Sequence, residues 1–150
     1  SAVDGIDGGW TMDDTVAYAK ELKKRGVDVI DCSSGGLVGS ATVARIKRTW
    51  GFQVPYADRV RREAEMMSMA VGLIIDPAHA EDILQKGQAD LIAIAREALV
   101  NPCWPQMAEV ALGRPMMDAL DDWTVQYGWW LKHRERSIAD IRADEAGAKR

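Results

Sequence analysis

The stretch from Met69 to Arg96, MAVGLIIDPAHAEDILQKGQADLIAIAR, decides the fold class of this chain. Two short apolar runs, MAVGLII and ADLIAI, bracket one amphipathic segment. Asp76 followed by Pro77 is typical of the start of a helix, and Gly87 is typical of its end. This strand–helix–strand order predicts two parallel strands joined by a crossover helix.

A glycine and an arginine mark the ends of these two expected strands. Gly72 lies inside the first run, and Ala95 and Arg96 close the second. The carboxyl ends of parallel strands meet at one edge of a sheet, which is where ligands bind in such folds. Glycine lets backbone N–H groups approach a phosphate group, and arginine offers it a charged fork. The two strand ends therefore predict a phosphate-binding edge.

The same alternation continues toward the N-terminus. Thr11 and Asp14 have capping-box spacing, and Gly26 is the expected end of the helix that they start. The run 27–30, VDVI, predicts another strand, and Pro55 begins the next helix. Together with the short helices expected at 97–100 and 105–112, the order is α-β-α-β-α-β-α. The charged end, 131–150, is expected to be either a helix that needs a partner or a frayed tail.

This order predicts a parallel α/β sheet with right-handed crossovers. Two architectures remain open from the residues alone: a doubly wound sheet, or part of a (β/α)8 barrel. The chain has 150 residues, whereas a complete barrel needs about 250. Three strands therefore form only a portion of a barrel, and we find no repeat or linker that divides the chain into domains.

Two polar segments are candidates for covering the phosphate-binding edge. The loop 31–36, DCSSGG, follows a strand and is as consistent with a ligand-binding loop as with a plain turn. The segment 37–54 predicts either a long covering loop or a short helix around 41–48. Its basic residues are expected to be solvated: Arg45, Lys47 and Arg48.

Composition limits the remaining function classes. The net charge of −4 argues against a general nucleic-acid binder, which needs a basic face. No run approaches the roughly 20 apolar residues of a membrane span, and no signal peptide is visible. Cys32 and Cys103 lack metal-type spacing, so we expect free thiols, no metal site and a cytoplasmic protein.

Four stretches together resemble the C-terminal half of the flavin-dependent ene-reductases of the old yellow enzyme family, in its thermophilic-like bacterial class. The stretches are VDVIDCSSGG (27–36), GFQVPYADRVRREAEMM (51–67), AVGLI (70–74) and ADLIAIAREALVNPCWP (89–105). The resemblance covers about residues 1–130, with 131–150 as a separate charged tail. It implies the C-terminal portion of a (β/α)8 TIM barrel that binds FMN. It also implies hydride transfer from NADPH or NADH to an activated C=C bond of a small α,β-unsaturated carbonyl substrate.

The resemblance gives individual residues a role. Gly72 matches the glycine whose backbone approaches the FMN phosphate. Ala95 and Arg96 match the family's Gly-Arg pair, in which the arginine holds the same phosphate; the alanine departs from that pair. Ser33 matches a position near the phosphate.

The stretch VQYGWW (125–130) resembles the tail that reaches the substrate pocket of a neighbouring subunit in a homo-oligomer. Tyr127 matches the family's tyrosine, and Trp129 stands where the family has an arginine, so packing of Trp129 within its own subunit is equally expected. The family's flavin cysteine, flavin-ring glutamine, histidine pair and proton-donating tyrosine have no counterpart here. Two readings follow: the phosphate-binding part of an FMN enzyme, or a non-catalytic half-barrel that needs a partner chain.

Overall fold

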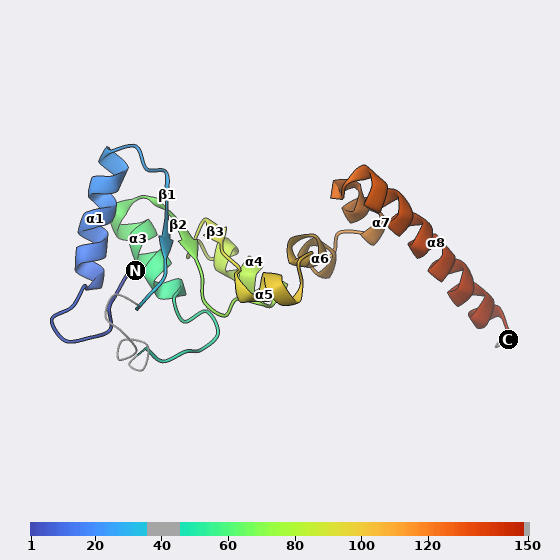
Figure 1. The fold of residues 1–150 in the computed structure, drawn as a ribbon, viewed down its shortest axis with the longest axis horizontal. Coiled ribbons are helices and arrows are strands. Elements are labelled where there is room, and N and C mark those ends of the chain that lie inside the picture. The colour runs from blue at the N-terminus through green and yellow to red at the C-terminus, as the bar shows by residue number, and fades with distance from the viewer. Residues whose placement is uncertain (36–45, 149–150) are drawn as a thin grey trace. The chain divides into compact units, whose positions relative to one another are not determined.

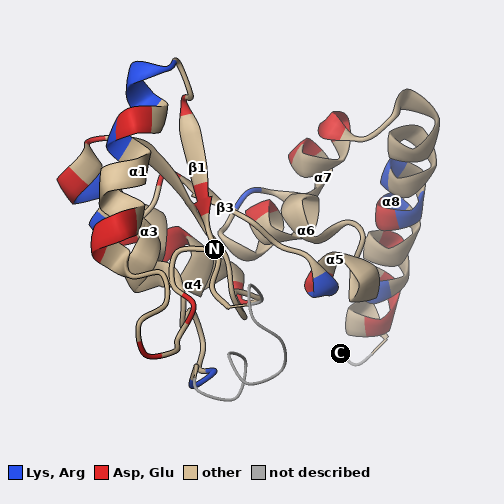
Figure 2. Cartoon of the chain, turned by 60° about the vertical axis from the view of Figure 1, so that its left-hand side comes forward, with Lys and Arg blue, Asp and Glu red and all other residues tan. Residues whose placement is uncertain are grey.

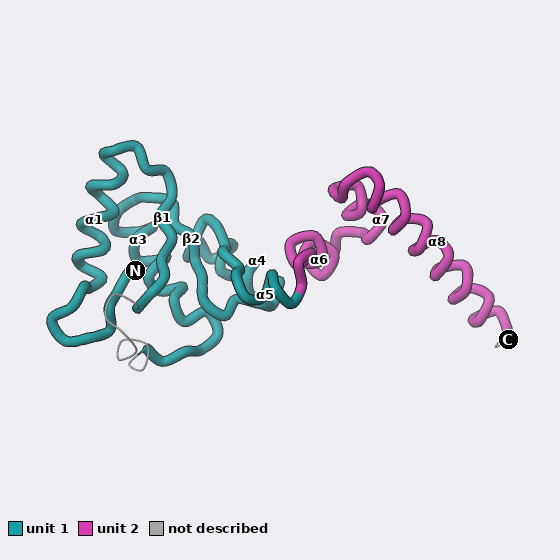
Figure 3. Tube along the Cα trace, in the orientation of Figure 1, with its two compact units in different colours: residues 1–100 teal, residues 101–150 magenta. Residues whose placement is uncertain are grey.

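The computed structural model describes residues 1–35 and 46–148 (Figure 1). Contacts within the chain divide it into two compact units, residues 1–100 and residues 101–150 (Figure 3). The first unit contains the sheet and the expected phosphate-binding edge. The second unit is helical.

Helix α1 (Met12–Lys24) begins and ends where the sequence predicts. The Thr11 hydroxyl oxygen accepts a hydrogen bond from the Asp14 N–H at 3.3 Å. The Asp14 carboxylate in turn accepts from the Thr11 N–H at 2.9 Å. This reciprocal pair satisfies N–H groups that have no partner inside the helix. Gly26, with φ +85°, follows the last turn and reverses the chain toward the first strand.

Three parallel strands form the sheet in the order β1-β2-β3. Their bounds are β1 (Val29–Cys32), β2 (Met67–Ala70) and β3 (Leu91–Ile92). Asp31 of β1 lies beside Met69 of β2, and Met69 lies beside Leu91 of β3. The predicted alternation of helices and strands in this unit is therefore confirmed.

Three helices follow the strands: α3 (Val54–Ala64), α4 (Pro77–Gln85) and α5 (Arg96–Val100). Helix α3 packs against α1, β1 and β2. Its apolar positions recur at helical spacing and are buried: Val54, Ala57, Val60 and Ala64. Helix α4 begins as predicted, because the Asp76 carboxylate accepts a hydrogen bond from the Ala78 N–H at 3.1 Å.

The predicted strand bounds were wrong by two to five residues. The first strand was expected at 27–30, but Asp31 and Cys32, expected in a loop, belong to β1. The second was expected at 69–75, but β2 ends at Ala70, so Gly72 lies in the loop that follows it. The third was expected at 89–94, and only two residues of it pair. The expectation of a loop or helix at 37–54 lies partly outside the described residues.

The two faces of the sheet have different surroundings. Cys32, Ser68 and Ala70 are fully buried, and their face receives the packing of α3. The opposite face carries Met67 and Leu91, which are 49% and 44% exposed. A parallel sheet is normally covered on both faces. We call the face that carries Met67 and Leu91 the open face of the sheet. It is unusual because the described helices leave it uncovered.

The second unit consists of α6 (Trp104–Ala111), α7 (Met116–Ala119), the short 3-10 helix η1 (Leu120–Asp122) and α8 (Val125–Gly147). Gly128 is buried where α8 packs against η1: a Cβ atom there would lie 2.6 Å from the Leu120 carbonyl oxygen. The segment 131–147 is helical, and it carries both acidic and basic residues along its length (Figure 2). None of the described helices is long and apolar enough to span a membrane.

Candidate functional site

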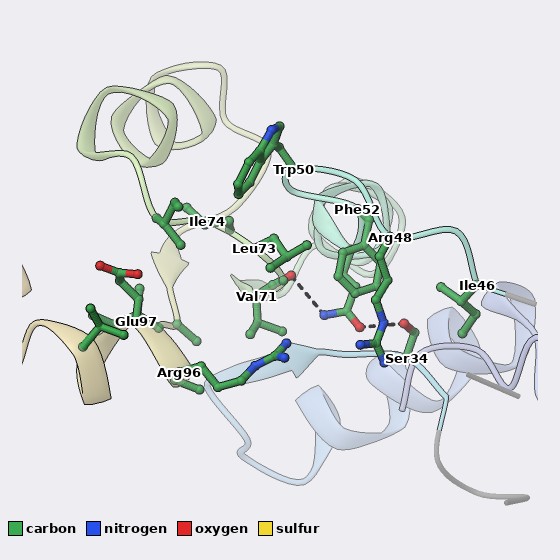
Figure 4. A pocket seen from close by; sticks show the side chains of 17 residues that line it. Ser34, Ile46, Arg48, Trp50, Phe52, Val71, Leu73, Ile74, Arg96 and Glu97 are labelled. Carbon is green, nitrogen blue, oxygen red and sulfur yellow. Dashed lines mark hydrogen bonds between the residues drawn. The ribbon is translucent and has the colours of Figure 1, made fainter. Parts of the chain in front are cut away.

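A pocket of about 480 Å³ opens at the carboxyl ends of the three strands (Figure 4). All of its lining residues belong to the first unit. They come from the segment after each strand, from α5 and from the segment that leads into α3: Ser34, 71–75, 93–97, Val100, Ile46, Arg48, Trp50, Phe52 and Gln53. This is the edge at which parallel α/β folds bind their ligands.

Gly72 allows the loop after β2 to pack tightly at the floor of this pocket. Its φ is +117°, a conformation that residues with a side chain rarely adopt. A Cβ atom on Gly72 would lie 2.8 Å from Gln53 Nε2 and 2.9 Å from Phe52 Cε1. Leu73 continues the turn with φ +54°, a strained value of the kind that occurs at ligand sites. Glycine at position 72 thus lets the main chain itself line the pocket.

Gln53 links the segments that follow β1 and β2 through hydrogen bonds of its side chain. Its side chain is buried, with 6% exposed. The Ser34 hydroxyl donates to Gln53 Oε1 at 2.6 Å, and Gln53 Nε2 donates to the Val71 carbonyl oxygen at 3.1 Å. One amide therefore fixes the segment after β1 to the segment after β2 and satisfies its own buried polar atoms.

Two arginines face the pocket without an anionic partner among the residues that the structure describes. Arg48 comes from the segment before α3, and Arg96 begins α5. Neither forms a hydrogen bond or ion pair with another described residue. Among the described lining residues only Glu97 is acidic, and its carboxylate extends away from the Arg96 guanidinium (Figure 4). The pocket consequently presents positive charge in a chain whose net charge is −4.

The structure brings together three of the predicted site residues, because Gly72, Ala95 and Arg96 all line the pocket. Ser33 does not line it. Its carbonyl oxygen accepts a hydrogen bond from the Ala2 N–H at 2.6 Å, and the neighbouring Ser34 takes the place in the pocket. The contact of Ser33 with a phosphate group stays a prediction.

Tyr127 and Trp129 lie on α8 in the second unit, so the described structure does not relate them to the pocket. They are 65% and 54% exposed. The Trp129 ring contacts Trp130 and His133, with ring centroids 4.5 Å and 4.2 Å apart. Their predicted position in the substrate pocket of a partner subunit stays a prediction.

Neither cysteine takes part in the pocket. Cys32 is buried under α3, and burial, helped by the charge of Asp31, raises the pKa of its thiol to about 12. Such a thiol is protonated and unreactive at neutral pH. Within the described residues, no group of three or more His, Cys, Asp and Glu side chains could hold a metal ion.

Among the pocket residues that were not predicted as site residues, three polar ones shape the site: Ser34, Arg48 and Gln53. Arg48 was expected to be solvated, and it is exposed but faces the pocket. The sequence position of Gln53 could have indicated its role. A long polar side chain directly before the apolar start of a helix is a candidate for a buried side chain that hydrogen-bonds two neighbouring segments. No local pattern distinguishes Arg48 from Lys47.

The fold and this pocket define a class of protein. The model of the NADH:flavin oxidoreductase / NADH oxidase family matches residues 1–114, so the chain belongs to this family of flavin-dependent oxidoreductases. The resemblance seen in the sequence is thereby confirmed.

Curated relatives point the same way. The chain is 46% identical over 131 residues to an NADPH dehydrogenase of Geobacillus sp. (strain WCH70), a match that covers 86% of this chain and 36% of the relative. It is 47% identical over 113 residues to an NADPH dehydrogenase of Halalkalibacterium halodurans, covering 75% and 32%. For an NADPH dehydrogenase of Bacillus subtilis the identity is 46% over 108 residues, covering 72% and 31%. The chain thus spans about a third of the length of these relatives.

Proposed function

We propose that this chain supplies the FMN-phosphate-binding part of an NAD(P)H oxidoreductase that reduces activated C=C bonds of α,β-unsaturated carbonyl compounds. Membership of a flavin oxidoreductase family supports flavin as the cofactor. The observation that carries the phosphate assignment is the pair of guanidinium groups, Arg48 and Arg96, on a pocket where the one described carboxylate turns away. An anion is the ligand that such a pocket accommodates.

The residues present fit a phosphomonoester. Arg96 offers a planar set of N–H donors, and the Gly72–Leu73 turn brings main chain to the pocket surface. FMN, when bound, supplies the redox chemistry that carries a hydride from NADPH or NADH to the alkene. The part of this chain is to hold the phosphate and so to orient the cofactor, with Gln53 keeping the two strand ends in place.

The open face of the sheet supports a portion of a barrel over a doubly wound sheet. A doubly wound sheet carries helices on both faces, whereas the inner face of a barrel is covered by the side chains of its other strands. Met67 and Leu91 lie on a face that the described helices leave accessible. We therefore infer that three strands of a (β/α)8 barrel are present here.

The tail proposal also comes from the resemblance. Tyr127 and Trp129 would enter the substrate pocket of a neighbouring subunit in a homo-oligomer. Their exposure on α8 leaves them accessible for such a contact. The competing proposal is a non-catalytic half-barrel that needs a partner chain.

Flavin binding by the full-length polypeptide that contains the chain tests the proposal. We expect visible flavin absorbance that NADPH bleaches under anaerobic conditions. Arg96→Ala should weaken FMN binding at least tenfold, because a charge-assisted hydrogen bond is lost. Arg62→Ala is a matched control, since Arg62 is exposed on α3 and pairs with Asp58, away from the pocket lining.

Two outcomes would contradict the assignment. An Arg96→Ala variant that keeps stoichiometric, tightly bound FMN would remove the phosphate role of this residue. A colourless protein that binds no added FMN, or one that binds it only after a partner chain is supplied, would favour the half-barrel reading.

A further inference from the structure

Arg48 is the feature of the pocket that the family resemblance leaves without a role. It lies on the segment that joins the first strand to α3, whereas Arg96 begins the helix after the third strand. Figure 4 shows both guanidinium groups directed into the same part of the pocket, with Ser34 nearby. The two cations therefore reach one space from two different strand–helix connections.

Within the described part of the chain, the lack of a partner sets these two arginines apart from the arginines of α3. Arg59 pairs with Asp13 and Glu63, Arg61 with Asp90, and Arg62 with Asp58. Each of these cations is balanced by carboxylates. Arg48 and Arg96 have no such balance among the described residues.

Like charges that share a pocket repel each other, and the attraction of both charges to a bound dianion offsets that repulsion. One guanidinium neutralises only half of the charge of a phosphomonoester, which carries nearly two negative charges at neutral pH. A second guanidinium supplies the other half. The Ser34 hydroxyl does not add a donor for the phosphate group, because it already donates to Gln53 Oε1.

We propose that Arg48 is a second phosphate-binding residue, which together with Arg96 makes the pocket selective for a phosphomonoester dianion. Two phosphomonoesters are relevant to an oxidoreductase of this kind: the 5′-phosphate of FMN and the 2′-phosphate of NADPH. The inference rests on the proposed function in that Arg96 is taken to hold the phosphate of FMN. It adds a residue and a selectivity that this function does not require.

The test measures binding of four ligands to the flavin-free full-length polypeptide that contains the chain. Dissociation constants are determined by calorimetry for FMN, riboflavin, NADPH and NADH, in the wild type and in Arg48→Ala, Arg48→Lys and Lys47→Ala variants. We expect Arg48→Ala to weaken one phosphorylated ligand roughly tenfold and its unphosphorylated counterpart little. Arg48→Lys should retain part of the affinity, since lysine keeps the charge but loses the planar fork.

The pattern of the losses identifies the source of the phosphate. A fall in the ratio of FMN to riboflavin affinity assigns Arg48 to the flavin, and a fall in the ratio of NADPH to NADH affinity assigns it to the nicotinamide cofactor. The loss should shrink at high salt, because the guanidinium is exposed and its charge is screened. Lys47→Ala is the control for net charge and should leave both ratios unchanged.

Three results would overturn the proposal. The first is an unchanged pair of ratios in Arg48→Ala. The second is an equal effect of Lys47→Ala, which reflects net charge alone. The third is a lower melting temperature of ligand-free Arg48→Ala, which indicates a structural role, since removing one of two unpaired like charges should leave stability unchanged or raise it. Failure of Arg96→Ala to release FMN would instead contradict the proposed function, so the two failures are distinguishable.

Discussion

Replacement of Gly72 by alanine would force a side chain into a tightly packed turn of the pocket. The backbone at Gly72 has φ +117°, and an alanine held there costs about 1–3 kcal/mol of conformational strain. The added Cβ would also lie 2.8 Å from Gln53 Nε2 and 2.9 Å from Phe52 Cε1. Displacing these atoms costs a further 1–3 kcal/mol or so, as overpacking usually does.

The expected loss for Gly72→Ala is therefore roughly 2–6 kcal/mol in the free energy of unfolding. Gly26→Ala is the matched control. Gly26 also has positive φ, +85°, but a Cβ there would meet nothing within 4 Å. Only the backbone term remains at Gly26, so that variant should lose about 1–2 kcal/mol.

Urea unfolding of the full-length polypeptide, followed by far-ultraviolet circular dichroism, measures both losses. The difference between the two variants isolates the contact with Gln53 and Phe52. Equal losses in Gly72→Ala and Gly26→Ala would refute the claim that close packing of this loop, rather than backbone conformation alone, requires glycine.

Three further perturbations test other features. Burial raises the pKa of the Cys32 thiol from 9.0 to about 12. Between these two pH values the folded state keeps the thiol proton and the unfolded state loses it, so the free energy of unfolding should fall as pH rises from about 9 toward 12. Cys32→Ala should flatten this fall. Iodoacetamide at pH 8 should label Cys103 but not Cys32. Asp90→Ala removes the partner of Arg61 at 3.0 Å and of a backbone N–H of β2 at 2.9 Å, so urea unfolding should show a loss of about 1–3 kcal/mol; a loss under 0.5 kcal/mol or so would contradict the role of this tie. Trp129→Ala should raise KM for the alkene without changing flavin content, and an unchanged KM would count against the tail proposal.

Helix ends were predictable from the sequence because their determinants are local. Thr11 and Asp14 satisfy each other's backbone groups within one turn, and Asp76 does the same for the start of α4. Strand ends were not predictable, because a strand ends where its neighbour does. MAVGLII has strand composition throughout, but β2 pairs with β1 only as far as Ala70, opposite Cys32.

The position of the two serines relative to the pocket has the same origin. Successive side chains of an extended segment point to opposite sides, so one residue decides which serine meets the pocket. The Ser34 hydroxyl reaches Gln53, and only the relative position of β1 and α3 determines this. Arg48 was missed for a related reason: the path of the segment before α3, rather than any sequence pattern, brings its guanidinium to the pocket that Arg96 also lines.

Because the sheet has an open face, the free energy of unfolding of this chain should depend on the concentration of any segment that binds that face. A polypeptide segment that covers Met67 and Leu91 binds the folded form and has no equivalent site on the unfolded form. At a free concentration 100 times its dissociation constant, such a segment adds about 2.7 kcal/mol to the free energy of unfolding. When such a segment is added as a separate polypeptide, the midpoint of thermal unfolding should rise with the logarithm of its concentration. The melting curve of the chain therefore measures how much of the segment is bound.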